Sequence, residues 1–500
     1  MYDPSSMTTL HSPIALVAQL AEALDEREVR YCHWKSNTAI ARSETGENDL
    51  DLLVDRRDAV AFREVLSQAG FSRAERQGKP LPPGKEDYFG HDPASGRLVH
   101  VDAHYQLVLG HDRTKNYRIP LEPEFLDQSQ RQGLFRLPPP ELEYVVLLVR
   151  MVLKYAIWDE VLWQTLRGRR AGLKASEQEE LADLESRIDP DRVAQIVRDH
   201  TPWLGDGLLA SCAAVARAEV SLAERLRTGR RLHRQLAVHA RHGEITDGPL
   251  RLARRLTVAW QTRVGSSPRF QLANGGAIVA VLGGDGSGKS TVIAELDAWL
   301  GAEFEMKQIH LGRPPWSATT YGIRGALKVV RLAGKVVGRA RHRPPPDDEE
   351  SEPPYRAMAW LACTARDRYL TYRKARRFAN RGGLVVSDRY PHPALQSMDV
   401  PLISHADTPK SSGRLTSILQ RLEHRYHDRI EFPEVMVVLR VDPDTAARRK
   451  TDEPTEYVKR RVAEVWEIDW EEASVPVIDA SRSKEEVAAE LKSLIWDALA

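Results

Sequence analysis

The chain has 500 residues, more than a single hydrophobic core usually supports, so we expect two or three domains. Its 72 lysine and arginine residues nearly balance 71 aspartate and glutamate residues, and the net charge of +1 excludes a global electrostatic attraction to nucleic acid or to a membrane. The three cysteines, Cys32, Cys212 and Cys363, form no CxxC pair, which is typical of a reducing compartment without structural zinc or a disulfide framework.

The start of the chain differs from a secretory signal, because acidic residues follow its short apolar stretch and no basic segment precedes it. No apolar run approaches the roughly 20 residues that span a bilayer. We therefore expect a cytoplasmic protein.

Residues 1–125 mix helical and strand patterns, which predicts an α+β domain. The segment 15–24 has the pattern of a helix, and the segments 49–55 and 98–108 have the pattern of strands. Asp49 and Asp51 stand two residues apart and hence on one face of the first strand, and Asp102 lies on the second. Three converging carboxylates would form an oxygen-rich site for Mg²⁺.

This arrangement, GENDLDLLV over residues 46–54 with VDAHY over 101–105, resembles the nucleotidyltransferase superfamily. The resemblance implies that Asp49, Asp51 and Asp102 bind the metal ion. Where that superfamily carries Gly-Ser on the preceding helix, this chain has Lys35-Ser36. An active transferase, in which Lys35 replaces backbone contacts to the triphosphate, and a degenerate domain without transfer activity both remain open.

Residues 126–270 are almost entirely helix-period segments, beginning after the prolines of LPPPELEYVVLLVRMVLKYAI. We expect a helical region that serves as an appendage or spacer. Aromatic residues are sparse among its arginines, so it predicts no specific nucleic-acid binding.

From Gly275 to the end of the chain, strand and helix patterns alternate, which predicts an α/β domain with a parallel sheet covered by helices on both faces. The run GGDGSGKS over residues 283–290 fits GxxxxGK[ST] between an apolar strand and a helix, the context expected of an ATP-binding P-loop. Lys289 would reach the β- and γ-phosphates, and the Ser290 hydroxyl would ligate Mg²⁺. The predicted ATP-binding residues are Gly283, Asp285, Gly286, Ser287, Gly288, Lys289, Ser290 and Thr291.

The run DGSGKST over 285–291, together with ARDRYLTYRKARRFANRGGLVVSDRY over 365–390 and PEVMVVLRVDPDTAARRK over 433–450, resembles the thymidylate kinase family. The resemblance implies that Asp285 contacts the acceptor and that Asp388 acts on the Mg²⁺ shell. The acceptor phosphate would be held by Arg389 together with Arg368 or Arg366, two alternatives that the sequence leaves open. The lid arginines would be Arg448 and Arg449, with Lys450 and Arg460 as weaker candidates, and the catalytic set would be Lys289, Arg389, Arg448, Arg449 and Asp388.

Two departures concern the acceptor. The family's Glu-Pro-Gly-Gly signature is replaced by HLGRPPW over residues 310–316, and Ala362 and Thr364 stand where an aromatic residue would stack on thymine. We therefore expect a small-molecule acceptor, a nucleotide or a carbohydrate-like compound, that is not strictly thymidylate. An ATP-dependent regulatory protein and a bifunctional kinase–nucleotidyltransferase remain alternatives.

Residues 323–339 place basic residues at helical spacing beside an apolar stripe, which predicts a basic amphipathic helix. Such a helix either packs on its domain with its charges in water or faces an anionic membrane surface or a polyanionic acceptor. Residues 342–355 are proline-rich and acidic, which predicts a disordered loop.

Overall fold

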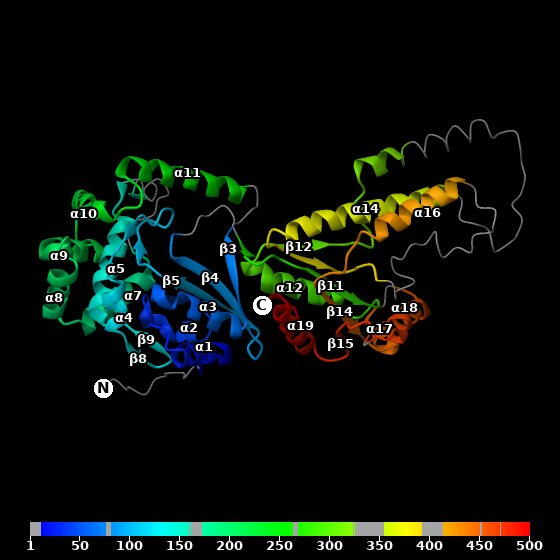
Figure 1. The fold of residues 1–500 in the computed structure, drawn as a ribbon, viewed down its shortest axis with the longest axis horizontal. Coiled ribbons are helices and arrows are strands. Elements are labelled where there is room, and N and C mark those ends of the chain that lie inside the picture. The colour runs from blue at the N-terminus through cyan, green and yellow to red at the C-terminus, as the bar shows by residue number, and fades with distance from the viewer. Residues whose placement is uncertain are drawn as a thin grey trace, which may run out of the picture. The chain divides into compact units, whose positions relative to one another are not determined.

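The computed structural model describes residues 12–76, 82–158, 160–161, 173–263, 269–323, 325, 355–392, 414–450, 453–470 and 472–500. The chain divides into two compact units, the first ending at residue 268 and the second spanning 269–499 (Figure 1). The helical region expected over 126–270 falls within the first unit except for its last two residues, and β10 begins at Phe270. Of the expected basic helix and acidic loop, only Ile323, Gly325 and Tyr355 are among the described residues.

A mixed sheet forms the first part of the first unit. Its strands lie in the order β1-β2-β5-β4-β3, with β2 and β5 parallel and the other neighbours antiparallel. The bounds are β1 Tyr31–His33, β2 Leu50–Val54, β3 Phe71–Arg76, β4 Lys85–Asp92 and β5 Arg97–His104. The helices here are α1 Ala15–Glu26, α2 Ile40–Glu44 and α3 Ala59–Gln68, with single turns η1 Asn37–Ala39 and η2 Arg56–Asp58. Because β2 and β5 are parallel, Asp51 is the register partner of Asp102.

The second part of the first unit is helical and is built around α5, Pro140–Tyr155, which is buried over most of its circumference. A helix that is apolar all round requires neighbours on every side, and α7, α8, α9 and α10 pack against it. The remaining helices are α4 Glu122–Asp127, α7 Ala175–Arg187, α8 Pro190–His200, α9 Gly205–Ala216, α10 Leu222–Gln235, η3 Ala237–His239 and α11 Glu244–Arg263. Two small hairpins, β6 Val108–Leu109 with β7 Tyr117–Arg118 and β8 Gln130–Gln132 with β9 Phe135–Leu137, precede α5.

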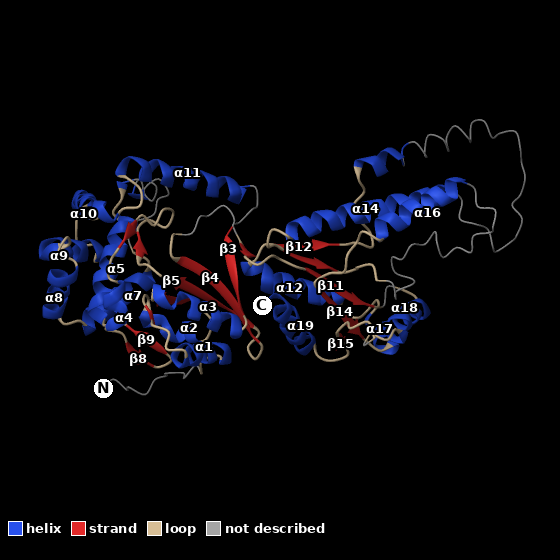
Figure 2. Ribbon diagram, viewed as in Figure 1, coloured by secondary structure: helices blue, strands red, loops and turns tan. Residues whose placement is uncertain are grey.

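The second unit is an α/β fold whose parallel sheet has the order β12-β13-β11-β14-β15 (Figure 2). Its central strands β11 and β14 are continuous apolar runs, as expected of strands buried on both faces. The strands are β10 Phe270–Leu272, β11 Ile278–Gly283, β12 Met306–Ile309, β13 Leu384–Ser387, β14 Val435–Arg440 and β15 Val477–Asp479. The helices are α12 Lys289–Glu303, α14 Tyr355–Ala379, α16 Arg414–His427, α17 Pro443–Arg449, α18 Thr455–Glu467 and α19 Lys484–Leu499.

Helices cover both faces of this sheet: α14 and α16 lie on one side, and α12 and α19 on the other (Figure 2). The carboxyl ends of parallel strands meet at one edge, so the loops after β11, β13 and β14 lie close together. That edge is where the predicted kinase residues occur. Within the described residues, no helix combines the length and the apolar character that crossing a membrane requires.

Candidate functional site

The P-loop after β11 depends on glycines at two close approaches. Gly283 and Gly286 both have positive φ angles, 149° and 81°. A Cβ atom on Gly283 would lie 2.7 Å from the Leu439 carbonyl oxygen, and one on Gly286 would lie 2.6 Å from the Ala446 carbonyl oxygen. Only glycine fits both positions, and the loop therefore packs against the end of β14 and against α17.

Lys289 is folded back onto its own loop. Its ammonium group donates to the carbonyl oxygens of Gly283 at 2.7 Å and Gly284 at 2.6 Å. Burial lowers the pKa of Lys289 to about 8, although the nearby Asp285 acts in the opposite direction. A buried cation without full compensation is suited to receiving an anion such as a nucleotide phosphate.

Asp285, inside the P-loop, is held between two arginines. Arg461 on α18 lies 2.8 Å from its carboxylate, and Arg389 after β13 lies 3.7 Å from it. Arg389 was among the residues implied by the family resemblance, but Arg461 was not. The neighbouring Arg460, a weaker candidate from the sequence, is exposed.

Asp388 and Ser290 are the residues here that can hold Mg²⁺. Asp388 follows β13, which pairs with β11 so that Ser387 is opposite Ala280, and Ser290 lies in the first turn of α12. The Oδ1 atom of Asp388 is buried and has no hydrogen-bond partner, while its Oδ2 lies 3.6 Å from His310 Nε2. A carboxylate oxygen without a partner, on the strand beside the P-loop, fits an oxygen-seeking divalent ion.

The two alternatives for the acceptor phosphate, Arg366 and Arg368, both contact the segment after β12. Arg368 is buried and donates to the Leu311 carbonyl oxygen at 2.8 Å. Arg366 donates to the hydroxyls of Ser317 and Thr320, each at 2.9 Å. Arg368 thus contacts the HLGRPPW segment that replaces the family's glycine pair, and Arg366 contacts the residues that follow it.

The predicted lid arginines lie on α17. Arg449 donates to the Ala480 carbonyl oxygen at 2.9 Å, and Arg448 donates to the Thr445 hydroxyl at 2.7 Å and is exposed. The structure ties Arg449 to the backbone after β15, whereas Arg448 lies on the surface of the helix that packs on the P-loop. Their catalytic role stays a prediction.

An aromatic cluster stands beside the Arg366 contacts, and sequence reasoning missed it. Trp316 makes edge-to-face contacts with Tyr321 and Trp360, with ring centroids 5.3 and 5.4 Å apart. Trp316 is 39% exposed and Tyr321 60% exposed, so each keeps an accessible ring surface. Ala362 is buried, and Thr364 donates its hydroxyl to the Trp360 carbonyl oxygen.

In the first unit, only two of the three aspartates predicted to bind Mg²⁺ lie together. Oxygen atoms of Asp51 and Asp102 and a ring nitrogen of His104 lie within 4.8 Å of one another. Asp49 is paired instead with His100, its carboxylate 2.9 Å from Nδ1. His104, a nitrogen ligand that the sequence did not suggest, takes the third place, so the Mg²⁺ assignment for the three aspartates stays a prediction.

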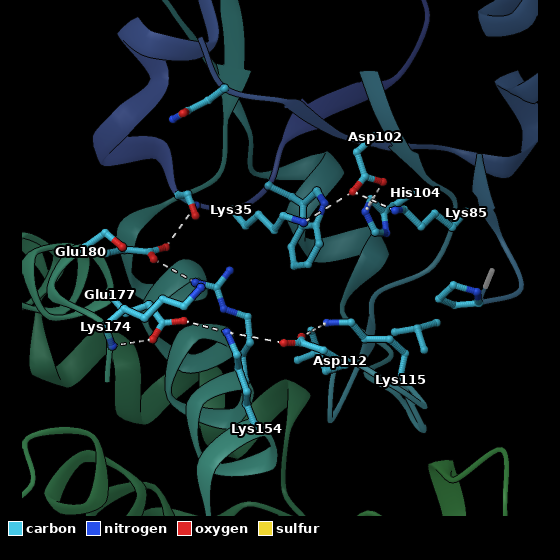
Figure 3. Close-up of a pocket in the computed structure, with 18 of the residues that line it drawn as sticks. Lys35, Lys85, Asp102, His104, Asp112, Lys115, Lys154, Lys174, Glu177 and Glu180 are labelled. Atoms are coloured by element: carbon cyan, nitrogen blue, oxygen red, sulfur yellow. Dashed lines mark hydrogen bonds and ion pairs between the residues drawn. The ribbon is translucent and has the colours of Figure 1, made fainter. Parts of the chain in front are cut away.

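Asp102 already has cationic neighbours (Figure 3), and so does Asp51. The Lys35 ammonium lies 2.6 Å from Asp51 and 3.8 Å from Asp102, and the Lys85 ammonium lies 3.1 Å from Asp102. Burial alone would lower the pKa of Lys35, but the two aspartates outweigh it and raise that pKa. Burial would raise the pKa of Asp102, yet His104 and the lysines hold it well below its usual range.

Comparison with known proteins shows which family the chain belongs to. A stretch of 226 residues, 44% of the chain, is 30% identical to a probable thymidylate kinase of Pyrobaculum aerophilum and covers 96% of that protein. The chain belongs to the thymidylate kinase family. Similar stretches are 26% identical to the uncharacterized ATP-binding protein YghR of Escherichia coli strain K12 and 25% identical to YghS of the same strain. They cover 44% and 42% of the chain, and 86% and 88% of those two proteins. No family model matches the chain.

The relatives agree with the geometry of the second unit. Two are named as ATP-binding proteins and one as a probable thymidylate kinase, and the second unit has a P-loop at the carboxyl edge of a parallel sheet. This member of the thymidylate kinase family therefore carries a P-loop ATP-binding region of the nucleotide-kinase type. The resemblance of the first unit to nucleotidyltransferases has no counterpart among these relatives.

Proposed function

We propose that the second unit is a Mg²⁺-dependent kinase that transfers the γ-phosphoryl group of ATP to a small acceptor, a nucleotide or a carbohydrate-like compound that is not strictly thymidylate. The observation that carries the proposal is the position of Asp285, held by Arg389 and Arg461 beside the P-loop lysine. An ATP-hydrolysing switch needs the P-loop, but it does not need a carboxylate with two arginines beside it.

The residues divide the work as phosphoryl transfer requires. Lys289 would leave the carbonyl groups of its loop and bind the β- and γ-phosphates. Arg389 and Arg461 would neutralise charge on the acceptor and on the transferring group, which is the main demand of this reaction. Ser290 and Asp388 would hold Mg²⁺, which would neutralise phosphate charge when bound.

The acceptor side is where this protein departs from its family. Asp285 would accept a hydrogen bond from an acceptor hydroxyl, and Arg366 or Arg368 would bind its phosphate. The exposed rings of Trp316 and Tyr321 offer a surface against which a base or the apolar face of a sugar can lie.

The test is turnover by the purified full chain with ATP, Mg²⁺ and a panel of nucleoside monophosphates and carbohydrates. We expect acceptor-dependent ADP release with at least one acceptor. Lys289→Ala should lower that rate by about 100-fold or more, by analogy with other lost electrostatic stabilisers. Lys459→Ala removes a half-exposed lysine of the same unit that is paired with Asp444, and it should leave the rate unchanged.

A chain whose only activity is slow ATP hydrolysis that survives Lys289→Ala would contradict the proposal. Tight ATP binding without any acceptor-dependent ADP release would instead favour an ATP-dependent regulatory protein.

A further inference from the structure

The first unit contains a cavity of about 520 Å³ that the proposed kinase reaction does not use (Figure 3). Its volume is in the range of pockets that bind small organic ligands. Nine lysine and arginine side chains line it, against four carboxylates, Asp102, Asp112, Glu177 and Glu180. The wall is therefore strongly cationic, although the chain as a whole is almost neutral.

The carboxylates in this wall are shared among the cations. Asp102 lies between Lys35 and Lys85, and Asp112 lies 3.2 Å from Lys115 and 3.8 Å from Lys154. Lys35, Lys85 and Lys154 each have a second carboxylate partner, Asp51, Asp87 and Glu177 respectively. Lys115, by contrast, shares Asp112 with Lys154. Burial lowers the pKa of Lys115, and Lys35 adds to that effect while Asp112 opposes it. The Lys35 and Lys115 side chains both line the cavity, and their like charges repel each other.

Two buried hydroxyl or N–H groups in the wall have no partner. Trp34 is 3% exposed and Thr114 is 3% exposed, and both line the cavity. The Trp34 indole Nε1 and the Thr114 hydroxyl are buried without a hydrogen-bond partner. Unpaired buried polar groups are uncommon in native proteins because burying a donor without an acceptor is energetically unfavourable. Oxygen atoms of a bound ligand would satisfy both.

The same wall is poorly suited to a divalent ion. The Lys35 ammonium, 2.6 Å from Asp51, lies where an ion bridging Asp51 and Asp102 would have to sit. One of the three candidate ligands is the nitrogen of His104, whereas Mg²⁺ prefers oxygen. The lysines thus take the charge-neutralising place that a metal ion would otherwise hold.

We propose that this cavity binds a phosphorylated small molecule directly on its lysine and arginine side chains, without a bridging divalent ion. The phosphate oxygens would accept from Lys115, from the Thr114 hydroxyl and from the Trp34 indole. Charge-assisted bonds of this kind are about twice as strong as neutral ones. The cavity belongs to the first unit and the P-loop to the second, so the proposal does not depend on the kinase activity.

Calorimetric titration with inorganic tripolyphosphate, in EDTA and at low salt, tests the proposal. The full chain should carry Lys289→Ala so that the P-loop contributes little. We expect one site, weakened about tenfold or more by Lys115→Gln and about fivefold by Thr114→Val. Arg27→Gln removes a surface charge outside the cavity and should change the dissociation constant by less than about twofold. Titration with a sugar monophosphate in place of tripolyphosphate distinguishes a monoester site from a polyphosphate site.

Binding that appears only when Mg²⁺ replaces EDTA would overturn the proposal and favour a metal–nucleotide site. Binding in EDTA that neither Lys115→Gln nor Thr114→Val weakens would also overturn it, because the anion would then lie elsewhere. Should Lys115→Gln fail to fold, as judged by its circular dichroism spectrum, Thr114→Val decides the question alone, since it removes one hydroxyl and keeps the shape of the side chain.

Discussion

At the scale of single residues, Arg461 is the most informative side chain of the proposed kinase site. Its 2.8 Å contact with Asp285 predicts that Arg461→Ala lowers kcat/KM by about 10- to 100-fold, because the transferring charge loses one of its neutralising groups. The adjacent Arg460 is exposed, so Arg460→Ala is the matched control and should stay within about twofold of the parent. Steady-state kinetics with the best acceptor measure both. Equal losses in the two variants would indicate a general charge effect of α18 and contradict a specific role.

Lys289 predicts a pH dependence of ATP binding. Its pKa in the free protein is about 8, and the phosphates of bound ATP raise it, so binding takes up a proton above pH 8. The ATP dissociation constant should therefore be constant from about pH 7 to 7.5 and then rise, by up to about tenfold per pH unit above pH 8. Calorimetry over this range measures it. Lys289→Arg keeps its charge throughout and should give a flat profile. A flat profile for the parent chain would contradict the prediction, because it would show that Lys289 stays protonated in the ATP-free protein above pH 8.

Thymidylate should be a poor acceptor or none. Neither Ala362 nor Thr364 can supply the base stacking that is worth roughly 1–3 kcal/mol, and the prolines of HLGRPPW reshape the acceptor wall. We expect at least a 10-fold loss of preference for thymine over other bases. Kinetics with the four deoxynucleoside monophosphates decide it. A thymidylate kcat/KM of about 10⁴ M⁻¹s⁻¹ or more with clear preference would contradict the prediction, and Trp316→Ala would then identify whether that ring supplies the stacking.

The sequence predicts residues of the candidate site most directly when one short run carries them. Lys289, Ser290 and the loop glycines follow from GxxxxGK[ST], because the backbone geometry of that loop is local. Arg461 could not be chosen over Arg460, since one residue turns a side chain by about 100° around a helix and only the packing of α18 decides which one faces the loop. The contact of Arg449 with Ala480 joins residues 31 positions apart and leaves no local signal.

At the scale of elements, helix packing in the first unit predicts opposite effects for two glycines. Gly229 on α10 lies against the carboxyl-terminal end of α5, and a Cβ atom at position 229 would overlap the carbonyl oxygen of Ala156. Gly229→Ala should therefore destabilise the unit by about 1–3 kcal/mol. Gly207 on α9 has nothing within 4 Å of its Cβ position, so Gly207→Ala should be neutral or stabilise by about 0.5–1 kcal/mol. Urea unfolding followed by circular dichroism measures both, and equal effects would contradict this account of the packing.

Elements differ in how much of them the sequence reveals. In the second unit, the strands β11, β13 and β14 are mostly apolar runs, so their sequences indicate buried strands. Strands β3 and β4 give no such signal. The sequence of β4, KEDYFGHD, is mostly polar, yet almost all of it is buried. Its charged residues have partners both on other elements and on β4 itself: Glu86 accepts two bonds from Arg63, and Asp87 pairs with His100 and with Lys85. A pattern based on hydrophobicity cannot anticipate burial that depends on ion pairs.

At the scale of the whole molecule, separate cores predict separate unfolding. The buried clusters around α5 and around β2 belong to the first unit, and the cluster around β11 belongs to the second. Domains with their own cores generally unfold as their own cooperative steps. We expect two calorimetric transitions, and ATP–Mg²⁺ should raise the midpoint temperature of only the one that belongs to the second unit. At a ligand concentration 100 times the dissociation constant, the unfolding free energy of that unit should increase by about 2.7 kcal/mol.

The Lys289→Ala variant should lose most of this stabilisation while keeping both transitions. A single transition that ATP–Mg²⁺ shifts as a whole would contradict the prediction, because it would mean that the two cores are thermodynamically one.

The pairing of Asp51 with Asp102 on neighbouring parallel strands also bears on how this protein tolerates changes of length. Inserting or deleting one residue within β2 would turn Asp51 to the opposite face of the sheet and bring Leu50 or Leu52 to face Lys35. A single point replacement at Asp51 removes one carboxylate, whereas a one-residue insertion removes the carboxylate and also places an apolar side chain beside Lys35. Changes in loop length between β2 and β5 avoid both effects, because they leave the strands themselves intact. Relatives that keep this cavity should therefore differ in the length of that connection and not within the strands.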